Sequence, residues 1–141
     1  MELTARDFER IPRRNLRIPV REFARLWFHA ERRADAMEVA GEPEHPYLRG
    51  VCSTCEWLAG VIVTVSGVNG PASVFVPSPV TGMLDKAYEE LIAEETQAAE
   101  QVVADSLRGE PGFVDGVLAT LEWAWRRSGV PPIDMEHAAA G

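Results

Sequence analysis

Apolar residues recur every three to four positions along much of the chain, which is the spacing of a helix with one buried face. The first such stretch covers about residues 19–39 and begins at Pro19, a residue that the first turn of a helix tolerates. Arginine and histidine side chains occupy its opposite face. We expect a helix there with a buried stripe formed by Val20, Phe23, Ala24, Trp27, Ala34 and Met37.

The same pattern predicts three further helices. One covers about residues 47–58, after two prolines and a glycine in GEPEHP have ended the first helix. A second covers about residues 83–107. The last, at about residues 113–128, ends before Gly129 and two prolines. The helix at 83–107 has an acidic outer face formed by Glu89, Glu90, Glu94, Glu95 and Glu100.

Residues 61–76 have a different pattern. They are rich in valine on both sides of Asn69-Gly70, a pair that favours the tight turn of a β-hairpin. A hairpin is therefore one prediction for this stretch; an extended loop, or continuation of the preceding helix to about Val65, is the alternative. A lone hairpin is marginally stable, so it would have to pack on the helices or join a partner's sheet.

The chain also contains an internal echo. Residues 47–57, YLRGVCSTCEW, resemble residues 113–123, FVDGVLATLEW, and a GEP tripeptide precedes each copy. Such self-similarity indicates a duplicated helical hairpin, although two unrelated amphipathic helices of similar composition would look alike. The identical pairs are Gly50/Gly116, Val51/Val117, Thr54/Thr120, Glu56/Glu122 and Trp57/Trp123.

These elements predict an all-α fold in which two repeated helical hairpins form an antiparallel four-helix bundle, with a small β-hairpin insertion at residues 61–76 as an option. The chain length suits one domain. We expect the following organisation: a basic arm at 1–18, a single helical domain at 19–129 (hairpin one 19–60, connector 61–80, hairpin two 81–129) and a flexible tail at 130–141.

Charge is distributed unevenly. The net charge is −8, yet residues 1–33 hold nine arginines against five acids, while residues 34–141 hold five basic residues against seventeen acids. A basic arm on an acidic body is typical of contacts with an acidic partner or nucleic acid, or of an arm that folds onto its own body or a neighbouring subunit. Because we find neither a signal peptide nor a membrane-spanning run, we expect a cytoplasmic protein without membrane contact.

The Cys52-x-x-Cys55 motif invites a redox or zinc interpretation. No second such pair accompanies it, and leucines occupy the aligned positions of the echo, so we expect two small buried hydrophobes. Glu56 and Glu122 could instead meet as a carboxylate pair, although surface glutamates are far commoner. We predict no catalytic residue, no cofactor and no metal site.

The resulting hypothesis is a non-enzymatic interaction or assembly component whose partner is another protein or a second copy in a homodimer. It would act through the basic arm and aromatic helix surfaces, unless the bundle buries its tryptophans. The alternative is a nucleic-acid-binding accessory protein that uses the same arginines. The candidate partner-binding residues are Arg10, Arg13, Arg14, Arg17, Arg21, Trp27, Trp57 and Trp123.

Overall fold

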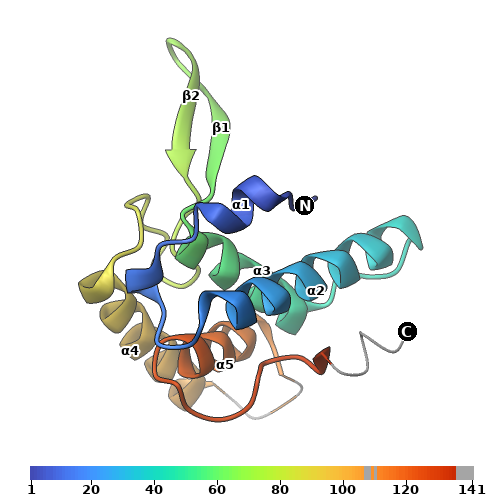
Figure 1. The fold of residues 1–141 in the computed structure, drawn as a ribbon, viewed down its shortest axis with the longest axis vertical. Helices are drawn as coiled ribbons and strands as arrows, with labels where there is room; N and C mark the ends of the chain where they lie inside the picture. The colour runs from blue at the N-terminus through green and yellow to red at the C-terminus, as the bar shows by residue number, and fades with distance from the viewer. Residues whose placement is uncertain (107–108, 110, 136–141) are drawn as a thin grey trace.

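The computed structural model describes residues 1–106, 109 and 111–135, and within them the chain forms five α-helices, a short 3-10 helix and one two-stranded antiparallel sheet (Figure 1). The helices form a compact body from which the sheet projects. In chain order the elements are α1 (Ala5–Glu9), η1 (Arg13–Asn15), α2 (Val20–Val39), α3 (Pro46–Ala59), β1 (Ile62–Gly67), β2 (Gly70–Phe75), α4 (Glu89–Asp105) and α5 (Phe113–Ala124).

Two glycines bring α3 and α5 into backbone contact at the centre of the body. Gly50 of α3 lies against the backbone of Phe113, and Gly116 of α5 lies against the backbone of Tyr47. A Cβ atom at either glycine would overlap the carbonyl oxygen of the facing residue, so no larger residue fits at this separation. The approach of the two helices therefore depends on both glycines.

The contact is reciprocal between the two echoing segments, because each glycine faces the first residue of the other segment. The buried threonines also behave alike: Thr54 Oγ1 donates to the Gly50 carbonyl at 2.7 Å, and Thr120 Oγ1 donates to the Gly116 carbonyl at 2.8 Å. Each hydroxyl is thus satisfied within its own helix. This reciprocity is what a duplicated hairpin predicts, and the duplication itself stays a prediction.

The predicted antiparallel four-helix bundle is wrong. The fold is mixed: it combines five helices with a two-stranded antiparallel sheet, and within the described residues α2 packs on α3, α3 on α5, and α4 on α5. The close glycine crossing explains the difference, because it replaces the long seam of interdigitating side chains that holds a bundle together. Helix α4 also begins at Glu89, six residues later than expected.

A polar loop takes the place of the expected first turns of that helix. The Glu95 carboxylate is buried and accepts hydrogen bonds from the backbone N–H groups of Val80, at 2.6 Å, and Thr81, at 3.2 Å. The Ser78 hydroxyl accepts another from the N–H of Met83 at 2.8 Å. These side chains satisfy the backbone N–H groups of the turn, which in a helix would be satisfied by backbone carbonyl groups.

Residues 1–18, the expected basic arm, pack against the body. Ile11 and Leu16 are buried. The buried Asn15 side chain donates to the carbonyl oxygens of Leu58, at 2.9 Å, and Ala87, at 3.1 Å. A satisfied buried amide of this kind ties the segment to the end of α3 and to the loop before α4.

The expected flexible tail is described only as far as residue 135. Within it, Ile133 is buried and the Tyr47 hydroxyl donates to the Pro132 carbonyl at 2.8 Å, which joins this part of the tail to α3. The remainder of the tail, residues 136–141, lies outside the described residues.

The two strands form the hairpin that Asn69-Gly70 suggested. Ile62 pairs with Phe75 at the base and Gly67 pairs with Gly70 at the tip. Gly60, with φ of 73°, ends α3 in the left-handed conformation and turns the chain into β1. Figure 1 shows the hairpin extending from the helices. Residues 62–70 are all exposed, so the strands add little to the core.

We predict that Gly50→Ala and Gly116→Ala each lower the free energy of unfolding by about 2–4 kcal/mol, because the added methyl group forces α3 and α5 apart. Urea denaturation followed by circular dichroism measures this. Gly112→Ala is the matched control: its Cβ would lie 3.8 Å from Asp115, an ordinary contact, and should cost less than about 1 kcal/mol. Equal losses of stability in all three variants would contradict the role of Gly50 and Gly116 in the α3–α5 contact.

Candidate functional site

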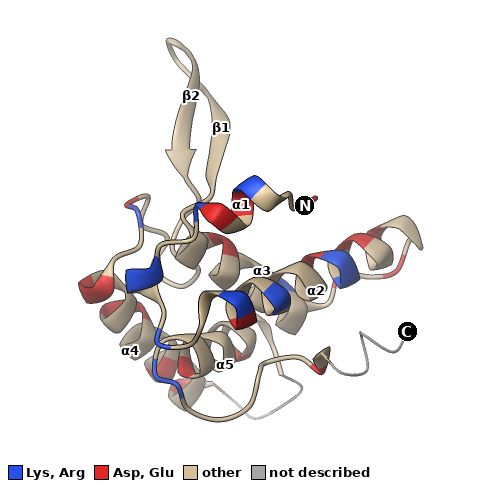
Figure 2. Cartoon of the chain, in the orientation of Figure 1, with Lys and Arg blue, Asp and Glu red and all other residues tan. Residues whose placement is uncertain are grey.

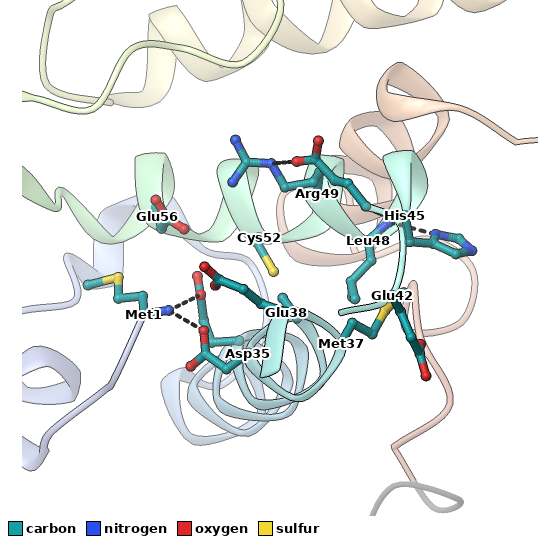
Figure 3. A pocket seen from close by; sticks show the side chains of 13 residues that line it. Met1, Asp35, Met37, Glu38, Glu42, His45, Leu48, Arg49, Cys52 and Glu56 are labelled. Carbon is teal, nitrogen blue, oxygen red and sulfur yellow. Dashed lines mark hydrogen bonds and ion pairs between the residues drawn. The ribbon is translucent and has the colours of Figure 1, made fainter. Parts of the chain in front are cut away.

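An acidic cavity of about 540 Å³ lies between the second half of α2 and the first turns of α3 (Figure 3). Arg49 is its main cationic side chain, and its Nε atom lies 2.6 Å from Glu44. The α-amino group of Met1 also borders the cavity, 2.7 Å from Asp35. The carboxyl groups in the lining belong to Glu31, Asp35, Glu38, Glu42, Glu44 and Glu56.

Two of these carboxyl groups, those of Glu31 and Glu56, interact across the α2–α3 boundary. Glu31 is buried and accepts a hydrogen bond from Trp27 Nε1 at 3.3 Å. Burial raises the pKa of Glu56 to about 8, and the interaction with the neighbouring Glu31 carboxyl group adds to the effect. Glu56 therefore keeps its proton to a higher pH than an ordinary glutamate does. The carboxyl group that faces Glu56 is thus Glu31, whereas the internal echo had suggested Glu122.

The two cysteines are free thiols with little reactivity. Cys52 lines the cavity and points into it in Figure 3, yet it is 2% exposed, and Cys55 is fully buried. Burial raises the pKa of both thiols well above the usual range, and neighbouring Glu31 and Glu56 raise it further. Because the thiolate is the reactive and metal-binding form, neither thiol is prepared for such chemistry at neutral pH.

A metal site is not formed by the described part of the chain, where no group of three His, Cys, Asp or Glu side chains is placed to hold an ion. The cavity is instead a polar region with two separate interactions. Arg49 forms an ion pair with Glu44, and the carboxyl group of Glu56 interacts with that of Glu31. Sequence reasoning missed it, because Glu31 and Glu56 belong to different helices and no spacing rule links them. The one available signal was Glu56 beside a tryptophan on a largely apolar helix.

The tryptophans proposed as partner-binding residues lie in the core. Trp27 and Trp57 are at most 1% exposed, and Trp123 is 7% exposed. Trp27 packs edge-on against Phe8 with ring centroids 6.0 Å apart, which shows that the N-terminal segment covers it. These three side chains are therefore buried, although not by the expected bundle, and they form no aromatic helix surface.

The arginines proposed as partner-binding residues stay at the surface. Figure 2 shows basic positions distributed along the N-terminal segment from α1 into α2. Arg17 is engaged with the body, since its guanidinium group lies 3.4 Å from Glu89 and 4.0 Å from the ring centroid of Trp125. The others are exposed and form no ion pair within the described residues: Arg10, Arg13, Arg14 and Arg21.

The hairpin is the least charged surface of the molecule. No charged residue occurs between Trp57 and Leu84, and Figure 2 shows both strands without acidic or basic positions. Ile62, Val65 and Val68 are 57%, 43% and 104% exposed. Exposed β-branched side chains on an uncharged ribbon are unusual for a monomer surface and are typical of a contact element.

We predict that Glu56→Gln increases stability most at high pH. The pKa of Glu56 in the folded chain, about 8, exceeds its usual value of 4.5, so the folded state binds the extra proton. That stabilisation is complete below pH 4.5 and is lost as pH rises through about 8. Glutamine keeps the donor at all pH values, and the variant should exceed the native protein by about 1–3 kcal/mol at pH 9 and by much less at pH 5.

Thermal unfolding between pH 5 and pH 9 measures this difference. Glu122→Gln, at the aligned position on α5, is the control for loss of a negative charge. A stability difference for Glu56→Gln that does not change with pH would show that the carboxyl pair shares no proton.

No protein-family model, curated protein or solved structure matches the chain. Within the described residues, no helix combines the length and the apolar character that crossing a membrane requires. What the protein does therefore has to be inferred from its own surfaces.

Proposed function

We propose that the protein is a non-enzymatic interaction or assembly component, and that the β-hairpin at residues 62–75 is its principal contact element. The supporting observation is the uncharged ribbon, exposed along both strands, that extends from the helical body. Main-chain pairing at a sheet edge is a common way for one protein to bind another.

The energetics favour a hairpin that is bound to a partner. A two-stranded hairpin is marginally stable in water, and this one has no extensive contact with any helix of the body. Val63, Val65 and Val74 lie on one face of the ribbon, where they gain little burial from the chain itself. Contact with a partner would remove these side chains from water and add backbone hydrogen bonds to the free edges.

The side chains with reactive potential do not favour an enzyme. The thiols of Cys52 and Cys55 are held protonated by burial, and burial beside Glu31 raises the pKa of Glu56. These groups stabilise the α2–α3 contact. The proposal therefore assigns them to the fold and assigns binding to the surface.

The N-terminal arginines favour nucleic acid as the second candidate. Arg10, Arg13, Arg14 and Arg21 project from a segment whose backbone is anchored, so ordering them on a partner costs little backbone entropy. Guanidinium groups bind phosphate well, but the net charge of −8 opposes a polyanion. An acidic protein surface would satisfy the same arginines.

We predict that excising residues 62–75 changes the free energy of unfolding by less than about 1 kcal/mol but abolishes retention of the partner protein. Val61 and Val76 are joined by a hydrogen bond of 3.0 Å, so an Asn-Gly turn can connect them without moving the helices. Affinity capture of the tagged protein from host lysate, with and without nuclease, measures retention.

The matched variant is Arg10→Ala/Arg13→Ala/Arg14→Ala, which alters the other surface. A stoichiometric protein that survives nuclease and is lost only on excision supports the proposal. Nucleic acid that is retained by the excised form and lost with the arginine variant would overturn it and favour the second candidate.

A further inference from the structure

The outer edges of the hairpin can be assigned from one hydrogen bond. Val76 N–H donates to the Val61 carbonyl at 3.0 Å, so these two residues face each other in a hydrogen-bonded pair. Such pairs alternate along an antiparallel ladder, which means that the next residues direct their backbone groups outward. With the observed register, the outward residues are Ile62, Thr64 and Ser66 on β1, and Pro71, Ser73 and Phe75 on β2.

The two edges are therefore unlike. On β1, each of the three outward residues has both an N–H donor and a carbonyl acceptor available. On β2, Pro71 has no N–H and interrupts the row of donors near the tip. Proline at an outward position is a common device that prevents a further strand from pairing. The hairpin thus has one open edge and one partly blocked edge.

We infer that β1 pairs antiparallel with β1 of a second copy, so that two hairpins form a four-stranded sheet in a symmetric dimer. The inference rests on the proposed function and names its partner. A two-fold axis at Thr64 aligns Ile62 with Ser66 of the second copy, and Thr64 with its own equivalent. Every outward N–H and carbonyl group of β1 then meets a complementary group, which is the requirement for an isologous contact.

The charges favour a second copy as the occupant. Identical strands placed side by side repel if they contain charged residues, and β1 contains none. Antiparallel pairing also places the two helical bodies at opposite ends of a ribbon roughly 20 Å long. This separation exceeds the Debye length of about 8 Å at physiological salt, so two bodies of net charge −8 are screened from one another.

The geometry also limits the assembly to two copies. The two β1 strands pair with each other at the centre of the four-stranded sheet. The outer strands are the β2 strands, which contain Pro71. A closed dimer results, and not an extending fibre. The valine faces of the two hairpins lie on the same side of this sheet, because the two-fold axis is perpendicular to it.

The test compares variants at Thr64 and Ser73, which face each other across the hairpin on opposite edges. Thr64→Pro removes the outward donor at the two-fold axis, and Thr64→Lys places like charges there. Ser73→Pro and Ser73→Lys make the same changes at the β2 edge. Sedimentation velocity over a wide range of protein concentration gives the dimer dissociation constant, and circular dichroism reports whether each variant is folded.

We expect a native dimer whose dissociation constant rises by about a hundredfold in both Thr64 variants, since proline removes two central hydrogen bonds and lysine places two like charges at the two-fold axis. The Ser73 variants should change it by less than about threefold. If proline disturbs folding, the lysine pair still gives the comparison. A monomeric native protein, equal effects at the two edges, or a dimer insensitive to Thr64 would each overturn the inference.

Failure of this inference can be distinguished from failure of the proposed function. If the protein is a monomer and excision of the hairpin abolishes binding of a different protein, the proposed function holds and only the identity of the partner is wrong. If the partner is still bound after excision, both proposals are wrong.

Discussion

Backbone contact between α3 and α5 at Gly50 and Gly116 is the constraint on which the other features depend. It sets the position and rotation of α3, which directs Cys55 and Trp57 into the core and Glu56 toward α2. It also places the end of α3, where Gly60 reverses the chain and sends β1 away from the body. The cavity, the buried thiols and the projecting hairpin all follow from the placement of this helix.

The α2–α3 contact adds a second constraint, which is electrostatic. Burial and the neighbouring Glu31 carboxyl group raise the pKa of Glu56 to about 8, and the Met1 ammonium group, 3.4 Å from Glu31, adds positive charge at the same boundary. The Trp27 indole N–H donates a hydrogen bond to Glu31 at 3.3 Å. The protonation of Glu56 is therefore linked to the stability of the α2–α3 contact.

Much of the local structure could be predicted from the sequence, because periodicity and breakers report on local geometry. The expected helix at 19–39 corresponds to Val20–Val39, and the expected helix at 47–58 to Pro46–Ala59. Tertiary contacts escaped prediction. Helix α4 begins late because Glu95, assigned by its pattern to a solvated acidic face, is buried and binds the backbone of a preceding turn.

The candidate binding residues were likewise predicted only in part. Arginines at the surface follow from composition, and Arg13 and Arg14 lie where expected. Trp57 and Trp123 lie beside apolar stripes, so their burial depends on which segments cover them, and a helical pattern does not contain that information. The bundle failed for a related reason: period and length do not distinguish a glycine-mediated crossing from a long seam of side chains.

The two surfaces differ in a physical property that separates their roles. Contacts made by arginines weaken as salt is added, because ions screen exposed charges. Contacts made by an uncharged ribbon depend on burial and backbone hydrogen bonds, and salt changes these little. The chain keeps the two kinds of contact apart, with charge on the N-terminal segment and none between Trp57 and Leu84. Association through the hairpin should therefore persist at ionic strengths that release any partner held by the arginines.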